Sequence, residues 1–216
     1  MSIYLPDRVA TAARTREAFV ALHAYTGGGE PRDLPAGTPT DARAVVDFWR
    51  AAGPSLWFAK DVAFDRSFRD RFLALHEAAA SGALESWEAT PDGTLALLIL
   101  LDQFPRNAFR GTPRMYATDD LAKAIAARAV AAGQDRAVAI DLRIFMYLPF
   151  GHSEDLADQN RSVELGRALA AEMLAHAEHH RDIVRRFGRF PHRNPILGRG
   201  MTVEEQRFLD EGGFAG

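Results

Sequence analysis

Three short polar segments each follow or interrupt an apolar helical stretch, and they hold the residues best suited to chemistry. They are residues 102–107 (DQFPRN), 152–159 (HSEDLADQ) and 189–195 (RFPHRNP). Arginine binds carboxylates and phosphates through two parallel hydrogen bonds, and histidine exchanges protons near neutral pH. A pocket that joins these residue types with carboxylates would bind a small anion and could move protons on it.

The first segment closes the most apolar stretch of the chain, residues 95–101. Because a residue before proline avoids the right-handed helical region, we expect the chain to turn at Phe104. The turn would present Asp102 and Arg106 at a corner. A structural interpretation is also open, in which Arg106 and Arg110 bind the last carbonyls of the helix and pair with Asp102.

The second segment has the ordinary composition of a helix start, with Ser153 as its cap and Glu154 and Asp155 near the N-terminus. Such a start would repel a phosphate and would favour an arginine or a cation. A metal held by His152, Asp155 and Asp158 is conceivable. However, the spacing matches no zinc or calcium motif, and we predict no metal site.

The third segment lies within residues 181–199, which hold six arginines and one acid, Asp182. Pro191 and Pro195 stiffen the loop, and a stiff loop is a suitable base for a site. Two interpretations stay open. The arginines form a ligand site with His192, or they pair with acids of the other segments and lock the C-terminal part of the chain onto the helices.

Two further histidines, His176 and His180, are one helical turn apart, a spacing that metal ligands can use. The sequence around them is not the His-Glu-x-x-His motif of zinc proteases, so we expect them to face solvent. The chain has no P-loop, dinucleotide-binding, hydrolase or kinase motif. It has no cysteine, which excludes thiolate chemistry and disulfides. The sequence thus leaves any cofactor unknown.

The composition is that of a folded protein, with 216 residues, 47% of them hydrophobic and 25% charged. A net charge of −3 gives no electrostatic reason to bind nucleic acid or an anionic membrane. The longest apolar run is too short to span a bilayer, and the N-terminus lacks the pattern of a signal peptide. We expect a cytoplasmic protein that binds neither nucleic acid nor membrane.

Apolar residues recur at helical spacing and no segment alternates like a strand, so we predict an all-α protein. About eight helices would form an antiparallel array, either a bundle or a tetratricopeptide-like superhelix. Their approximate ranges are 7–25, 40–52, 61–80 (beginning at Asp61 or Asp65), 90–101, 118–132, 137–148, 153–187 (divided near Gly166 or somewhat later) and a short helix from 202. The residues expected in the core include Leu97, Leu98, Leu101, Ile144 and Phe145.

A glycine- and proline-rich linker follows the first of these helices. We therefore expect residues 1–39 to be an accessory helix with its linker, and residues 40–216 to form the main helical domain.

From about residue 44 to 214 the sequence resembles DUF924, a bacterial family of unknown function. The resemblance lies in VDFW (46–49), WF (57–58), LLDQFPRN (100–107), HSED (152–155) and RFGRFPHRN (186–194). It implies an all-helical fold related to tetratricopeptide superhelices, but no established activity, cofactor or substrate. The chain departs from the family pattern in its first forty residues and at Arg50, where another aromatic residue is common.

The family's polar blocks coincide with the three segments, and a histidine matching His180 also belongs to its pattern. We predict that the protein binds a small anionic metabolite there, and whether it also acts on it stays open. The alternative is a tetratricopeptide-like scaffold that binds a peptide or a partner protein. The candidate catalytic residues are His152 and His192, and the candidate ligand-binding residues are Asp102, Gln103, Arg106, Asn107, Glu154, Asp155, Gln159, His180, Arg189, Arg193 and Asn194.

Charges from distant segments would lack partners unless the segments meet. We therefore predict that Arg106, His152, Glu154 and Arg193 share one cavity or polar network. A ligand site should keep at least one arginine and one histidine in contact with water, whereas a structural network should be closed and dry.

Overall fold

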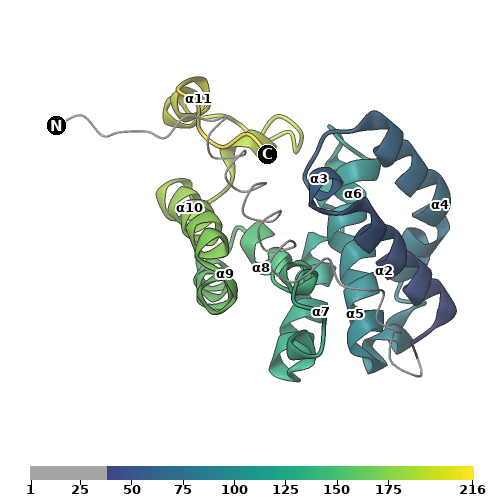
Figure 1. The fold of residues 1–216 in the computed structure, drawn as a ribbon. Helices are drawn as coiled ribbons and strands as arrows, with labels where there is room; N and C mark the ends of the chain where they lie inside the picture. Colours follow the sequence, from purple (N-terminus) through teal and green to yellow (C-terminus); the bar gives the residue numbers. More distant parts are fainter. Residues whose placement is uncertain (1–37) are drawn as a thin grey trace.

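The computed structural model describes residues 38–216, which form helices and loops without a β-strand (Figure 1). The all-α prediction is confirmed. The predicted helix over 7–25 and most of its linker lie outside the described residues. The longer helices are α2 (Thr40–Ala52), α4 (Val62–Ala80), α5 (Pro91–Leu98), α7 (Asp119–Ala131), α9 (Leu156–Leu169), α10 (Ala171–Phe187) and α11 (Val203–Asp210). Three short helices complete the set, α3 (Pro54–Trp57), α6 (Phe104–Ala108) and α8 (Leu148–His152).

Several helix starts follow directly from local sequence. The side chain of Asp61 caps α4, and Thr90 caps α5 with Pro91 in the first position. Thr202 and Glu205 form the expected capping box of α11. The start of α9 differs from the prediction, because Asp155 rather than Ser153 accepts hydrogen bonds from the first backbone N–H groups.

Helix α5 and the π-helical turn after it, Ile99–Gln103, lie at the centre of the main core. Every residue from Leu95 to Leu101 is buried, because the sequence is apolar on all sides there. α2 and α7 pack against α5, and α4 packs against the π turn and α6. The predicted core residues are all buried, namely Leu97, Leu98, Leu101, Ile144 and Phe145.

Aromatic rings close this core on the α2 and α4 side. Trp49 is fully buried and contacts the rings of Trp57, Phe68 and Phe145 at centroid distances of 6.3, 5.3 and 5.3 Å. The indole N–H of Trp57 donates to the carbonyl of Trp49. Each large apolar side chain buried in this way stabilises the fold by about 1.5–3 kcal/mol.

A smaller core lies at the C-terminal end, where Ile183, Val184 and Phe190 are buried against three partly buried phenylalanines, Phe187, Phe208 and Phe214. Figure 1 shows α9, α10 and α11 on the opposite side of the molecule from α2, α4 and α5. The tract from 153 to 187 divides at Ala170, within the range predicted for its division.

Two local predictions were wrong. Residues 137–148 form turns and a short 3-10 helix (Arg143–Met146), because Arg143 donates to the carbonyls of Arg136 and Val138 and thereby satisfies an irregular backbone. The segment is apolar because it is buried, and periodicity alone cannot distinguish a buried irregular segment from a buried helix. The chain also does not turn at Phe104, which has helical dihedral angles, since the π turn carries the helix on into α6.

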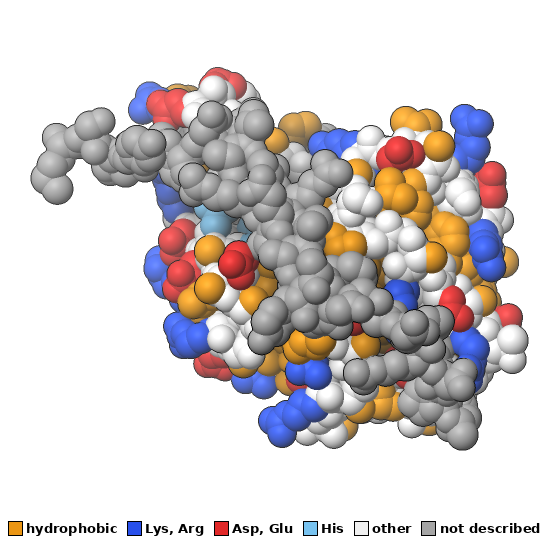
Figure 2. Space-filling view, in the orientation of Figure 1, with side chains coloured by type: hydrophobic (Ala, Val, Ile, Leu, Met, Phe, Trp, Pro, Cys, Tyr) orange, Lys and Arg blue, Asp and Glu red, His pale blue; other side chains and the backbone are white. Residues whose placement is uncertain are grey.

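On the face drawn in Figure 2, acidic and basic side chains are interspersed. Within the described part of the chain, no helix is both long enough and apolar enough to cross a membrane.

Candidate functional site

The π turn places Asp102 in the interior, beside His152 at the end of α8. The carboxylate accepts hydrogen bonds from Gln103 Nε2 at 2.6 Å and from His152 Nδ1 at 2.7 Å, and Arg106 lies 3.2 Å from it. Burial raises the pKa of Asp102, but the charges of Arg106 and His152 and the two hydrogen bonds outweigh it and hold the pKa at about 2. Asp102 is therefore ionised at neutral pH.

Because Asp102 is ionised, it must accept the hydrogen bond, and His152 carries a proton on Nδ1. Burial and the nearby charge of Arg106 lower the pKa of His152, against the opposing effect of Asp102. His152 is thus a neutral imidazole near pH 7. Its Nε2 has a free lone pair and meets no hydrogen-bond partner among the described residues.

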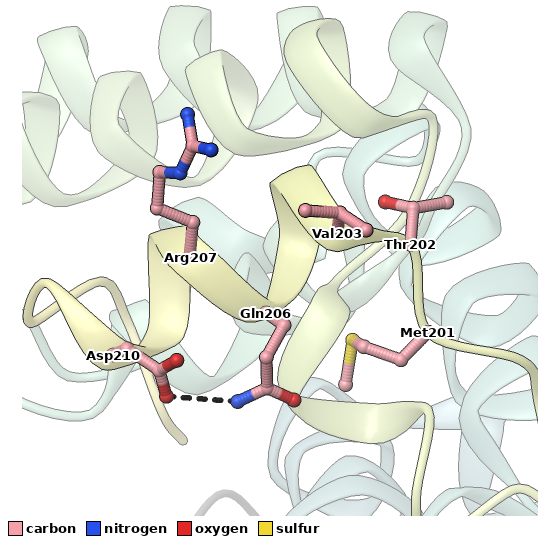
Figure 3. Close-up of a pocket in the computed structure, with 6 residues that line it drawn as sticks. All are labelled: Met201, Thr202, Val203, Gln206, Arg207 and Asp210. Atoms are coloured by element: carbon pink, nitrogen blue, oxygen red, sulfur yellow. Dashed lines mark hydrogen bonds between the residues drawn. The ribbon is translucent and has the colours of Figure 1, made fainter.

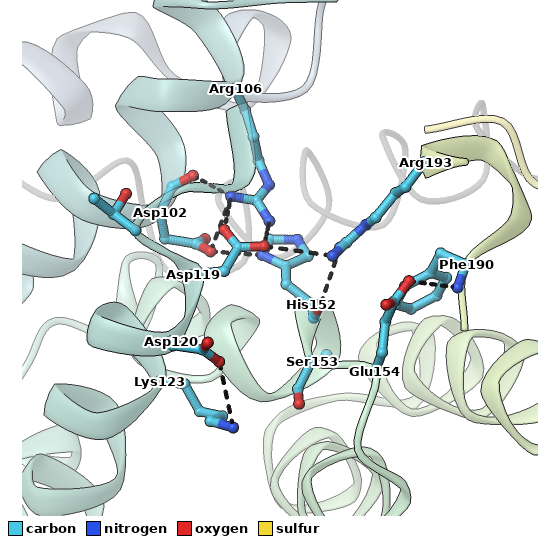
Figure 4. Close-up of polar contacts among 12 residues, drawn as sticks. Asp102, Arg106, Asp119, Asp120, Lys123, His152, Ser153, Glu154, Phe190 and Arg193 are labelled. Atoms are coloured by element: carbon cyan, nitrogen blue, oxygen red, sulfur yellow. Dashed lines mark hydrogen bonds and ion pairs between the residues drawn. The ribbon is translucent and has the colours of Figure 1, made fainter. Parts of the chain in front are cut away.

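Asp119, in the first turn of α7, joins two arginines from distant segments (Figure 4). Arg106 donates to both of its carboxylate oxygens at 2.9 and 3.0 Å. Arg193 reaches Asp119 Oδ2 only at 3.5 Å and donates to the carbonyl of His152 at 2.9 Å. Asp119 thus links the first and third polar segments, and Arg193 links both to the second.

The guanidinium of Arg193 lies between two aromatic rings, with its carbon 4.6 Å from the ring centre of Tyr116 and 4.7 Å from that of Phe190. Burial raises the pKa of the Tyr116 hydroxyl, while the nearby arginines oppose that change. Phe190 is fully buried, so it fixes Arg193 against the smaller core.

Glu154 continues the network on the C-terminal side. It accepts the backbone N–H of Phe190 at 2.7 Å and both terminal nitrogens of Arg199 at 2.6 and 2.9 Å. Burial raises the pKa of Glu154, but these hydrogen bonds and charges outweigh it, so the net shift is downward. Arg106, His152 and Arg193 therefore meet in one network as predicted, whereas Glu154 lies beside it and is connected to it through Phe190, whose ring packs on Arg193.

The other predicted residues of the third segment support this arrangement from outside. Arg189 donates to both carboxylate oxygens of Glu205 at 2.6 and 2.9 Å. Asn194 is fully buried, and its side chain bridges Arg199 and Glu205. These contacts tie the loop after α10 to the start of α11.

Three predicted residues have local structural contacts. Asn107 lies apart from the network, on the side of α6 that faces α4, and donates to Asp65 at 2.7 Å. Asp155 is the cap of α9. Gln159 is fully buried and donates to the carbonyls of Gly151 and Ser153, so it holds the end of α8 against α9.

The expectation that His176 and His180 face solvent was wrong. His180 is buried, and its ring lies 4.2 Å from that of His176 and 4.6 Å from that of Phe214. Burial lowers the pKa of His176 to about 4 and that of His192 to about 3, and it lowers the pKa of His180 strongly. The inner face of α10 is therefore a cluster of neutral imidazoles beside the network.

Several buried polar atoms near this junction have no hydrogen-bond partner among the described residues. They are Arg193 Nε, His192 Nδ1, His180 Nε2 and Gln159 Oε1. Buried polar groups are normally hydrogen-bonded, so these atoms provide unused capacity for binding. No group of three histidine or carboxylate side chains in residues 38–216 is placed to hold a metal ion.

Sequence reasoning did not identify Asp119, Tyr116 or Arg199 as parts of this network. In the sequence, Asp119 has the position of an ordinary first-turn acid, and Arg199 is one of many arginines. A surface hollow of about 460 Å³ beside α11 contains none of the candidate residues (Figure 3).

Comparisons with known proteins agree with this architecture. Residues 45–213 match the DUF924 family, described as a bacterial protein of unknown function. A solved structure of a protein of unknown function, ATU0120 from Agrobacterium tumefaciens, is 56% identical in sequence, with a TM-score of 0.78 over 79% of this chain and 97% of that chain. A search of curated proteins finds no match. The chain belongs to the DUF924 family of bacterial proteins of unknown function.

Proposed function

We propose that the protein binds a small anionic molecule where Arg193 meets the Asp102–His152 pair. The observation that carries this proposal is the incomplete pairing of Arg193. Its side chain is 9% exposed, its Nε is buried without a partner among the described residues, and its contact with Asp119 is 3.5 Å long.

The distribution of charge supports an anionic ligand. Three carboxylates and three arginines meet here, but they are not shared evenly. Arg106 binds Asp119 through two hydrogen bonds and also pairs with Asp102, and Arg199 takes both oxygens of Glu154. Burial and the neighbouring Arg106 lower the pKa of Arg193 more than Asp119 and Glu154 raise it, as expected for a buried cation that needs further negative charge. A carboxylate or phosphate would supply that charge.

The exposure of the site favours ligand binding over a closed structural network. The side chains of Arg106 and His152 keep 16% and 15% of their surface exposed. An arginine and a histidine at one junction therefore reach solvent, as a ligand site requires.

The Asp102–His152 pair would allow the site to accept a proton from the bound anion. A carboxylate that accepts the Nδ1 proton fixes the ring and leaves Nε2 as a base. A hydroxyl or acid proton on the bound anion would be transferred to Nε2. The low pKa of His152 keeps this base unprotonated at neutral pH.

The binding proposal can be tested by calorimetric titration of the full chain with inorganic phosphate and with malonate at low ionic strength. Arg193→Ala should weaken binding at least tenfold, about 1.4 kcal/mol, with the fold largely intact. The matched control is Arg186→Ala, because Arg186 pairs with Glu204 on the surface of the same region and should leave binding unchanged.

Two outcomes would contradict the proposal. The first is no binding of either anion by the unchanged protein. The second is a loss of about 3–5 kcal/mol of stability in Arg193→Ala without any effect on binding, which is the behaviour of a structural ion pair.

The proton-transfer role has a separate test. In His152→Asn, the amide nitrogen can replace the Nδ1 donor to Asp102, but nothing replaces Nε2. We expect this variant to keep the network and stability while losing any pH dependence of phosphate binding that arises from the imidazole. Unchanged pH dependence would show that Nε2 does not contact the ligand.

A further inference from the structure

We infer that His76, on α4, is a positioning residue for the Asp102–His152 pair and acts through the backbone of the π turn. The inference rests on the site proposed above for its functional meaning. His76 is outside all three polar segments and touches neither Asp102 nor His152 through the contacts found in the described residues.

His76 occupies a position that packing alone would give to an apolar ring. It is 3% exposed, with its ring stacked on Phe104 at 4.8 Å and near Phe109 at 5.5 Å. Burial lowers its pKa, so the imidazole is neutral there despite its hydrogen bond to the backbone. Its one polar contact is from Nδ1 to the carbonyl oxygen of Leu100, at 2.9 Å. Because that oxygen only accepts, Nδ1 is the donor.

The need for this donor follows from Pro105. In the π turn, the backbone N–H of Phe104 donates to Ile99, five residues back, rather than to Leu100. The same register would pair the Leu100 carbonyl with the N–H of residue 105. That residue is proline and has no N–H. The carbonyl of Leu100 is therefore left without a backbone donor, and the His76 side chain supplies one.

The next two carbonyls of the turn are also held by side chains. Thr118, which precedes α7, donates its hydroxyl to the carbonyl of Leu101. Arg106 donates to the carbonyl of Asp102 at 2.6 Å. Side chains from three different segments thus bind three consecutive carbonyls, and His76 is the one that makes no contact with Asp102, Asp119 or His152.

The π turn in turn directs Asp102. An extra residue in one helical turn rotates every side chain after it, so the direction of the Asp102 carboxylate depends on the turn keeping its π geometry. Without a donor for Leu100, the buried carbonyl would favour rearrangement of the turn. The 2.7 Å contact of Asp102 with His152 would then be lost.

The test compares His76→Phe, which keeps the ring and removes the donor, with His76→Asn, whose amide nitrogen can stand in for Nδ1. The readout is the Nδ1–H proton signal of His152 in the NMR spectrum of the full chain, which needs no ligand. We expect a protected signal in the unchanged protein and in His76→Asn, and its loss in His76→Phe.

Phe72→Leu is the matched control, since it perturbs a buried apolar residue of the same helix without removing a hydrogen-bond donor to the π turn. It should lower stability and keep the signal. A signal that persists in His76→Phe, or disappears equally in Phe72→Leu, would overturn the inference. Should His76→Phe fail to fold, Thr118→Val removes the donor of the neighbouring carbonyl and Thr118→Ser restores it, with the same expected loss and recovery.

Phosphate titration of the same variants separates this inference from the proposed function. Affinity should fall about tenfold in His76→Phe and stay within about twofold in His76→Asn. Loss of the His152 signal in a protein that binds no anion would leave His76 as a positioning residue and refute the ligand proposal alone. Reduced affinity with an intact His152 signal would contradict the positioning mechanism.

Discussion

The two ends of the molecule are held together by different forces. The main core around α5 is a continuous set of buried apolar residues that runs from α2 to α8 and also includes Leu165 of α9 and Met173 of α10. The smaller core at the C-terminal end has three buried apolar residues, and each of the six arginines in residues 181–199 has an acidic partner. The burial of apolar side chains stabilises a fold without requiring a particular orientation, whereas an ion pair stabilises only when its two groups have a specific geometry. The difference implies that the main part supplies most of the stability, and that the ion pairs of the C-terminal part fix how that part packs against the main part.

The candidate site lies where these two regions meet. Arg106 and Asp119 belong to the main part, Arg193 and Arg199 to the C-terminal part, and His152 to α8 between them. A site at such a junction is positioned by a rigid scaffold on one side and adjusted by polar contacts on the other.

Truncation within the main core should have the largest effect. Trp49→Ala removes a fully buried indole with several ring contacts. We expect a loss of about 3–5 kcal/mol in the free energy of unfolding, measured by chemical denaturation. Phe208→Ala, in the smaller core, should lose less. An equal or larger loss there would contradict the division of stability between the two regions.

A smaller and more local effect is expected from Glu154→Ala, which leaves Arg199 and the Phe190 N–H without their acceptor. The expected loss is about 2 kcal/mol. Amide hydrogen exchange should accelerate in residues 186–205 and stay unchanged in α5. The matched control is Glu164→Ala on the exposed surface of α9, where Glu164 pairs with Arg161 alone among the described residues. Uniform acceleration throughout the chain would show that the regions unfold as one unit.

Acid should weaken the C-terminal region first. His176 and His192 have lowered pKa values of about 4 and about 3, so the unfolded chain binds protons before the folded chain does. The stability that depends on their neutral forms is fully present above pH 6.5, and it is lost as the pH falls from there toward 4 for His176 and toward 3 for His192. At pH 5.5 each histidine should lower the free energy of unfolding by about 1.4 kcal/mol. Hydrogen exchange between pH 7 and 5.5, corrected for intrinsic rates, should show protection lost around α10 before α5, and His192→Phe should reduce the effect. Equal loss in both regions would contradict this prediction.

The smallest effect is expected for a surface pair. Arg186→Ala breaks the exposed contact with Glu204 and should change stability by less than about 1 kcal/mol, an effect that 1 M NaCl should largely remove. A loss of stability as large as that of Glu154→Ala would show that the surface ion pairs also hold the C-terminal part against the main part.

Much of the fold could be predicted from the sequence because its signals are local. The Thr90-Pro91 start, the capping box at Thr202 and the apolar stretch of α5 each need only neighbouring residues to be interpreted. The segment 137–148 was misassigned because a buried irregular segment has the same apolar composition as a buried helix. The tetratricopeptide-like superhelix stays a prediction.

The site could be predicted only in part. Residues in unusual polar blocks, such as Asp102, His152 and Arg193, were found because loops and helix ends do not need such sequences. Asp119 was missed because a first-turn acid is expected at almost any helix. His76 was missed because its partner is a backbone carbonyl, and a carbonyl left free by a proline cannot be recognised until the helical register is known.

The links among Arg106, Asp119, His152 and Arg193 span up to 74 residues of sequence. Contacts of such long sequence separation form late, since chain entropy must be lost before they contribute. During synthesis, most of the main core can close once α8 has emerged from the ribosome, with Leu165 and Met173 added soon after, but the site must wait for Arg193 and Arg199. The main part of the protein should therefore fold before the anion site is complete. An anion bound at the junction would stabilise the C-terminal segment, which is the last to fold.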